Sequence, residues 1–154
     1  MENQGSTATM NRPVGQASQQ LLDTLNDLRA RELAVCIQYM RHHYKVTGSD
    51  SFGPEQEFKE TALVEMKHAE KLGERIDFLG GDPTTKPENI ATAEETLQQM
   101  ATADLAAEED AVKRYRNAIQ QASDENDTTT RTILEGILAD EEEHVKVFRQ
   151  MLGK

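Results

Sequence analysis

The sequence has little cysteine, few aromatic residues and no long apolar run. Its single cysteine, Cys36, excludes a disulfide within the chain, which favours a reducing compartment. No apolar stretch approaches the ~20 residues that a membrane-spanning helix needs, and the polar N-terminus lacks the apolar segment of a signal peptide. These absences predict a soluble, cytoplasmic protein without a membrane partner.

Basic residues are also scarce relative to acidic ones. The 154 residues include 17 lysines and arginines against 28 aspartates and glutamates, which gives a formal net charge of −11. Such a chain repels nucleic-acid phosphates and anionic membrane surfaces, and it attracts cations. The composition therefore predicts no nucleic-acid partner and suits a protein that collects metal ions.

The chain divides into a short tail and one domain. Residues 1–17 are rich in Gly, Ser, Thr, Asn and Gln, and Pro13 and Gly15 interrupt any helix, so a flexible tail is expected. Residues 18–154 are enough for one hydrophobic core without disulfides. The low hydrophobic content of 36% fits amphipathic helices that keep long solvated faces.

Apolar residues at steps of three and four predict four helices and no strand. Ser18 is the expected cap of a helix to about residue 47, and Pro54 opens a second helix to about residue 79. Thr92 with Glu95 forms a capping-box pattern for the third, and Asp127 caps the fourth, to about residue 152. At ~3.3 Å per residue, the connection 82–91 reaches roughly 33 Å, about the length of a helix. The fold class predicted is an all-α four-helix bundle with a long crossover between helices two and three.

Each predicted helix has one glutamate in the middle of its inner apolar stripe. These glutamates, and a histidine three residues after two of them, are Glu32, Glu65, His68, Glu108, Glu141 and His144. Residues i and i+3 lie on one face of a helix. Glu32 precedes Glu65 by 33 residues, and Glu108 precedes Glu141 by the same interval, as in two similar hairpins packed face to face. The six side chains are therefore expected to meet at one level of the bundle.

A cluster of four buried carboxylates needs cations. Two like charges ~4 Å apart repel by roughly 4 kcal/mol at an effective dielectric constant of ~20. Two divalent metal ions neutralise four carboxylates, and mixed carboxylate and imidazole ligands suit Fe(II) or Mn(II) better than a structural zinc site. An acidic residue on a helix can also be an ordinary solvated charge. We adopt this interpretation for Glu109, Asp110, Glu142 and Glu143.

The sequence resembles bacterioferritin, within the ferritin-like di-iron superfamily. The resemblance covers about residues 18–152 and includes Glu-Leu-Ala at 32–34, Gln-Tyr at 38–39, Glu-Met-Lys-His at 65–68 and Asp-Glu-Glu-Glu-His at 140–144. It implies a ferritin-like bundle with a ferroxidase centre of two iron ions per subunit. Carried over by position, Glu32 and His68 bind one iron, Glu108 and His144 bind the other, and Glu65 and Glu141 bridge the two.

The same resemblance implies iron storage and detoxification by a hollow homo-oligomeric shell. The centre oxidises Fe(II) to Fe(III) with O2 or H2O2, and the oxidised iron is stored inside. Tyr39 matches a tyrosine near the family's centre, where it can supply an electron or a hydrogen bond; it can equally be a core aromatic residue.

Met66 matches the methionine with which bacterioferritins bind a haem shared between two subunits. The other interpretation of Met66 is a flexible side chain in a dry dimer interface. A second apolar stripe on the first helix also needs covering, by another subunit: Leu22, Leu33, Ile37, Met40 and Tyr44.

The sequence departs from bacterioferritin after the fourth helix, where no fifth helix is expected. This difference favours a shell of 12 subunits, as in the small-shell or Dps-like variants, over one of 24. Two alternatives to iron storage remain, namely a di-metal peroxidase or catalase without a mineral and a DNA-protecting protein of the Dps type, which the acidic charge opposes. His42 and His43 have no place in the motif and are expected to be partly exposed.

Overall fold

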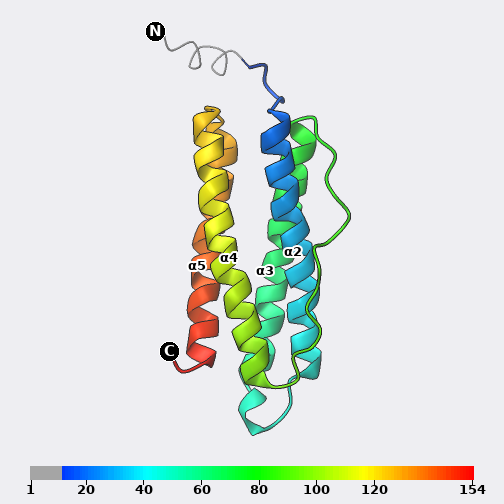
Figure 1. Ribbon diagram of the computed structural model, residues 1–154, viewed down its shortest axis with the longest axis vertical. Coiled ribbons are helices and arrows are strands. Elements are labelled where there is room, and N and C mark those ends of the chain that lie inside the picture. Colours follow the sequence, from blue (N-terminus) through cyan, green and yellow to red (C-terminus); the bar gives the residue numbers. More distant parts are fainter. Residues whose placement is uncertain (1–11) are drawn as a thin grey trace.

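Four long helices make up the bundle (Figure 1). The computed structural model describes residues 12–154, so most of the predicted tail lies outside the described residues. The helices are α2 (Gln19–Lys45), α3 (Pro54–Phe78), α4 (Leu97–Asp124) and α5 (Thr128–Met151), with a short 3-10 helix η1 (Ser49–Ser51) before α3. Between residues 12 and 154 there is no strand, and no helix follows α5. The prediction of an all-α four-helix bundle is confirmed.

Two antiparallel hairpins form the bundle. Helices α2 and α3 pack along each other, as do α4 and α5, and Figure 1 shows the two pairs side by side. Because the segment after α3 returns along the whole bundle, α4 starts at the same end as α3 and runs parallel to it. This arrangement lets one residue near the middle of every helix point to the same level.

Three of the four predicted helix starts are correct. The Ser18 hydroxyl accepts a hydrogen bond from the backbone N–H of Leu21 at 3.0 Å, which caps α2. Pro54 is the first residue of α3, where its missing N–H has no intrahelical partner to lose. The Asp127 carboxylate accepts from the Thr130 N–H at 3.0 Å and caps α5.

The predicted start of the third helix at Thr92 is wrong. Helix α4 begins at Leu97, and its capping box is formed by Thr96 and Gln99, which repeat the same residue pattern four positions later. Residues 81–95, between α3 and this capping box, have no helical structure. They stay outside the helix because the crossover needs their length to reach the far end of the bundle.

The crossover is fixed along α2 by a series of hydrogen bonds. Near its start, the Asn26 side chain donates to the Asp82 carbonyl at 3.0 Å and accepts from the Thr84 N–H at 2.8 Å. Further along, the Glu88 N–H donates to the Ala30 carbonyl at 3.0 Å. Near the other end, Arg41 donates to the carbonyl of Glu94 at 3.1 Å. The prediction that this segment follows the length of the bundle is confirmed.

The core consists of two apolar clusters with a polar layer between them. The buried residues of the first cluster are Leu21, Leu22, Leu25, Leu28, Leu72, Ile76, Leu79, Ala111, Tyr115, Ala118, Ala122, Leu134 and Ile137. Those of the second are Val35, Tyr39, Val46, Phe58, Ala62, Met100, Leu105, Val145 and Phe148. Along every helix, the glutamate of the predicted cluster lies between the stretches that supply these two clusters. Packed apolar layers thus close the polar layer from both ends.

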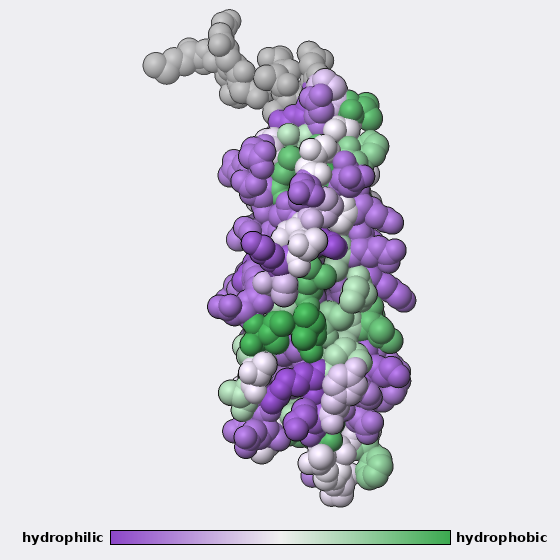
Figure 2. Space-filling model, turned by 90° about the vertical axis from the view of Figure 1, so that its right-hand side faces the viewer, coloured by the Kyte–Doolittle hydropathy of each residue, from purple (hydrophilic) through white to green (hydrophobic). Residues whose placement is uncertain are grey.

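The second apolar stripe of α2 is only partly exposed. Leu22 is buried in the first cluster, contrary to the expectation that it needs another subunit. Ile37 and Tyr44 remain exposed, as do Leu63 and Met66 on the neighbouring helix α3. Figure 2 looks onto the side of the bundle where α2 and α3 lie and shows hydrophobic surface gathered in its lower half. No helix within residues 12–154 combines the length and the apolar character that crossing a membrane requires.

Candidate metal centre

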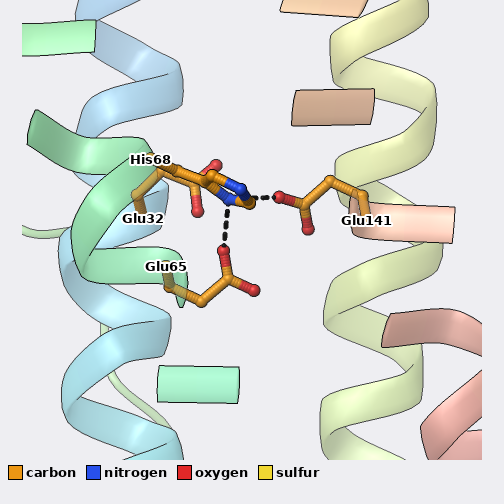
Figure 3. A group of neighbouring side chains, drawn as sticks. All are labelled: Glu32, Glu65, His68 and Glu141. Carbon is orange, nitrogen blue, oxygen red and sulfur yellow. Dashed lines mark hydrogen bonds and ion pairs between the residues drawn. The ribbon is translucent and has the colours of Figure 1, made fainter. Parts of the chain in front are cut away.

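The six side chains singled out in the sequence lie together in the polar layer. They are Glu32 from α2, Glu65 and His68 from α3, Glu108 from α4, and Glu141 and His144 from α5, and all six are buried. Figure 3 shows four of them, with the His68 ring lying between carboxylates that come from different helices. Each helix supplies a residue from its midpoint because the two hairpins have the same register.

The ligand atoms fall into two overlapping groups, each compact enough to hold one cation. The first group is Glu32, Glu65, His68 and Glu141, and the second is Glu65, Glu108, Glu141 and His144. Within each group, the four donor atoms lie within 4.8 Å of one another. Glu65 and Glu141 belong to both groups. The two groups are thus neighbouring candidate cation positions with two carboxylates in common.

The contacts of His68 fit a metal ligand better than a histidine satisfied by hydrogen bonds. Its Nδ1 atom lies 2.9 Å from Glu65 Oε2 and also 2.9 Å from Glu141 Oε1, as the dashed lines of Figure 3 mark. One N–H proton cannot serve both carboxylates well, whereas a cation can. The Nε2 atom lies 3.0 Å from Asp140 Oδ2, so an N–H there donates to Asp140 and leaves Nδ1 free to bind a metal.

Several buried polar atoms of the cluster have ion-pair contacts but no contact with the geometry of a hydrogen bond. They are Glu65 Oε1, Glu108 Oε2, Glu141 Oε1 and His144 Nδ1. An unpaired buried polar atom is costly, and such atoms in a native structure indicate an ion or a ligand. His144 Nδ1 lies 2.9 Å from Glu65 Oε1, so these atoms face one another inside the cluster. Carboxylate oxygens and imidazole nitrogens with open positions are a donor set that suits iron or manganese.

Two buried tyrosines hold the outer carboxylates of the cluster. The Tyr39 hydroxyl donates to Glu108, and the Tyr115 hydroxyl donates to Glu32, so each bond joins one hairpin to the other. Burial raises the pKa of both hydroxyls well above the ordinary value, and the adjacent carboxylate raises it further. Both tyrosines therefore remain protonated donors. The sequence analysis singled out Tyr39 only, although Tyr115 follows Glu108 by the same seven residues that separate Tyr39 from Glu32.

Arg31 is a residue of the centre that the sequence analysis missed. Its side chain is only 3% exposed and ends among the four carboxylates. Nη1 lies 2.8 Å from Glu32 Oε2 and 3.3 Å from Glu141 Oε2, and Nη2 lies 3.1 Å from Glu108 Oε2. As the immediate neighbour of Glu32 it lies off the inner stripe, and only the length of an arginine lets the guanidinium reach the centre.

The electrostatics of the cluster depend on these positive groups. Burial lowers the pKa of both histidines, but their close contacts with the carboxylates outweigh it and raise the pKa of His68 to about 10 and that of His144 to about 12. Burial and Glu141 raise the pKa of Glu65, but His144, His68 and Arg31 outweigh them and lower it to about 2. Burial raises the pKa of Glu32 well above its ordinary value, although Arg31 opposes this. Without a metal ion, protons and a guanidinium therefore balance the carboxylates.

His42 is not partly exposed, as the sequence analysis expected, but fully buried. Its Nδ1 atom lies 2.8 Å from Asp104 Oδ2, and its ring packs edge-on against Phe58. The helical register turns His42 toward α4, where a buried aspartate supplies the polar partner. His43 is half-buried, as expected, and its Nδ1 lies 2.8 Å from the Glu55 carbonyl.

The acidic residues interpreted as solvated charges are exposed. Glu109, Asp110, Glu142 and Glu143 all lie on the surface, so the distinction from the buried glutamates is confirmed. Met66 is 50% exposed on the outer side of α3. Cys36 is buried near the same side, and burial, with the negative charges of Glu65 and Glu32, raises the pKa of its thiol.

The comparisons with known proteins agree with this geometry. Residues 22–154 match the family described as Ferritin-like domain. The bacterioferritin BfrA of Mycobacterium tuberculosis is 32% identical over 140 residues, which cover 89% of this chain and 86% of that protein. The chain belongs to the bacterioferritin family. Its fold matches the solved structure of the same mycobacterial bacterioferritin with a TM-score of 0.81 and 31% identity, covering 90% of this chain and 87% of that one.

Two further relatives show the breadth of the family. The bacterioferritin of Desulfovibrio desulfuricans is 29% identical over 131 residues, which cover 85% of this chain and 73% of that protein. A protein of Synechococcus described as a nutrient stress-induced DNA-binding protein is 32% identical over 133 residues, covering 80% of this chain and 76% of its own length. Membership of the bacterioferritins, a family that stores iron, makes the DNA-protecting alternative the less favoured one.

Proposed function

We propose that the chain is a ferroxidase that stores iron, with Fe(II) as its substrate and O2 or H2O2 as the oxidant. The observation that supports this most is the pair of overlapping ligand groups that share Glu65 and Glu141. In the proposed centre, Glu32 and His68 bind one iron, Glu108 and His144 bind the other, and the shared carboxylates bridge them. Two iron ions held next to each other supply the two electrons that reduce O2 to H2O2, or H2O2 to water, and two protons are consumed in either case.

The surrounding residues prepare this site for cations. The net charge of −11 raises the concentration of Fe(II) around the protein. Asp140 accepts from His68 Nε2 and so directs the Nδ1 lone pair into the centre. When a metal ion binds to His68 and His144, it replaces one proton on each imidazole ring. The released protons are then available where the oxidant is reduced. Tyr39 and Tyr115 fix the orientation of Glu108 and Glu32, and Tyr39 is proposed to act at the centre through its hydrogen bond to Glu108.

Iron uptake tests the proposal directly. Fe(II) is added aerobically to the metal-free assembly, and the retained Fe(III) is measured per subunit after gel filtration. We expect a stored mineral of many iron atoms per subunit for the wild type, and slow oxidation with little retention for Glu65→Ala. The control is Glu142→Ala, an exposed glutamate of the same type, which should behave as the wild type. Retention of only a few iron atoms per subunit, with rapid H2O2 consumption, would instead support the peroxidase or catalase alternative.

We further propose that the chain assembles into a homo-oligomeric shell. The exposed apolar side chains of Ile37, Leu63 and Met66, on neighbouring faces of α2 and α3, support a subunit interface on that side. Native mass measurement gives the number directly, as about 12 or 24 times the 17.3 kDa subunit. A monomer in solution would contradict the proposal.

A haem shared by two subunits is the proposed second cofactor, with Met66 as its ligand. The Met66 thioether lies on the outer side of α3, where a partner's Met66 can approach it across a twofold axis, and it takes no part in the core clusters. The purified protein should show a Soret band, which Met66→Leu abolishes and Met151→Leu preserves. A Soret band that survives in Met66→Leu excludes Met66 as the haem ligand. If the wild type shows no Soret band, the interpretation of Met66 as an interface residue stands.

The proposed setting is the cytoplasm, without DNA as a partner. The net charge of −11 opposes the binding of nucleic-acid phosphates, which supports the absence of DNA. A gel-shift experiment at low salt tests the point, because retention of DNA would restore the DNA-protecting alternative.

A further inference from the structure

The guanidinium of Arg31 lies where the two proposed metal positions meet. Its Nη1 contacts three of the four members of the His68 group, at 2.8 Å from Glu32, 3.3 Å from Glu141 and 3.7 Å from Glu65. Its Nη2 contacts Glu108, which belongs only to the His144 group, at 3.1 Å. Arg31 is therefore a cation in direct contact with all four carboxylates.

Few other contacts hold Arg31 in this position. Nη2 lies 3.3 Å from the Ala107 carbonyl, and Nε is buried without a hydrogen-bond partner. A guanidinium is always charged in a protein, and one left in a dry core needs compensating carboxylates. Without metal ions, the four glutamates supply this compensation, and Arg31 in turn reduces their mutual repulsion.

Two divalent ions and the guanidinium do not fit the same centre. Four carboxylates carry at most four negative charges, which two divalent ions already balance, so Arg31 would add an uncompensated buried charge. The carboxylates that Arg31 contacts are the same ones that supply the ligand atoms of the two groups. Arg31 contacts three carboxylates of each group, because Glu65 and Glu141 belong to both, so an ion in either group competes for three of its contacts and two ions compete for all four.

We infer that Arg31 is a built-in competitor of the second metal ion, so that the centre fills in two steps. The first ion binds while the guanidinium still compensates the remaining carboxylates, and the second binds only when the guanidinium moves out. This inference rests on the proposed di-metal centre and adds stepwise filling to it. Arg31 is thus a positioning residue that keeps the metal-free centre intact and weakens its second site.

Titration of the metal-free assembly with Co(II), followed by the visible absorption of bound cobalt, tests the inference without iron oxidation. We expect two ions per subunit, with the second bound at least tenfold more weakly than the first. In Arg31→Gln the second ion should bind at least tenfold more tightly, and the metal-free protein should unfold at a lower temperature. Arg31→Lys keeps the positive charge and should keep the weak second site. Arg41→Gln, on the same helix but bound to the Glu94 carbonyl, should leave both constants unchanged.

The outcomes separate this inference from the proposed function. Two tight ions in the wild type, with a second constant that Arg31→Gln changes less than threefold, would overturn the role of Arg31 and leave the di-metal centre standing. No cobalt bound by either protein would overturn both. If Arg31→Gln does not fold, the comparison of Arg31→Ala with Arg31→Lys decides instead. Arg31→Ala removes the positive charge and should bind the second ion more tightly, whereas Arg31→Lys keeps the charge and should not.

Discussion

The Nε2 atom of His68 lies 3.0 Å from the Oδ2 atom of Asp140, a residue on the neighbouring helix α5. This bond fixes the tautomer in which Nδ1 faces the carboxylates. Replacing a residue that hydrogen-bonds to a metal-binding histidine usually lowers the affinity for the metal by ~10 to 100-fold. We expect Asp140→Ala to weaken Co(II) binding by about tenfold, as measured by titration, and Glu142→Ala to leave it unchanged. Equal affinities for the wild type and Asp140→Ala would show that Asp140 does not orient His68.

Tyr115 is expected to stabilise the bundle through Glu32. A hydrogen bond to a buried carboxyl group contributes ~1 to 3 kcal/mol, and its loss leaves Glu32 without this donor. Tyr115→Phe should therefore lower the free energy of unfolding in urea by about 1 to 3 kcal/mol, and Tyr39→Phe should have a similar effect through Glu108. The third tyrosine of the chain, Tyr44, is exposed, so Tyr44→Phe is the control that should change nothing.

The stability of the metal-free protein should fall in alkaline solution. The folded pKa of His68, about 10, lies above the ordinary value of 6.5, so the folded state binds a proton that the unfolded state has lost. This contribution is complete below pH 6.5 and disappears as the pH rises through about 10. We expect urea midpoints to decrease over that interval, and less steeply in His68→Gln. A midpoint that rises with pH would contradict the assignment.

Glu65 makes the stability of the metal-free protein fall at acidic pH, in the opposite direction to the effect of His68. Its folded pKa of about 2 lies below the ordinary 4.5, so its contribution is complete above pH 4.5 and is lost as the pH falls toward 2. The wild type should lose more stability than Glu65→Gln over this interval, as urea midpoints at pH 5 and pH 3 will show. Parallel losses in the two proteins would mean that Glu65 does not take part in acid unfolding.

Asp104 is expected to hold the crossover against the bundle. Its two carboxylate oxygens accept from Gln38 at 2.8 Å and face His42 Nδ1 at 2.8 Å, while Gln38 accepts from the Ala91 N–H at 3.3 Å. Asp104→Ala leaves buried polar groups unpaired, which should cost about 2 to 4 kcal/mol. Amide hydrogen exchange at Ala91 should become faster. Asp110→Ala, at an exposed position of the same helix, should alter neither quantity.

The sequence determined the four helices, their order and the six buried polar residues of the candidate metal centre. Apolar spacing fixes which face of each helix is inside, and a glutamate within that spacing must then be buried too, so Glu32 and its counterparts could be placed without coordinates. Capping residues such as Ser18 and Asp127 act on their own helix, which makes them readable locally. The crossover's path also followed from its length alone.

Only the tertiary structure decided which groups meet across helices. Arg31 and Asp140 lie next to ligands along the chain but off the inner stripes, and their roles depend on how far a long side chain reaches and on how two helices are rotated against each other. The burial of His42 depends on an aspartate 62 residues away, and the start of α4 depends on how far the crossover had to extend. Helical periodicity sets directions within one helix, whereas distances between side chains of different helices are set by packing.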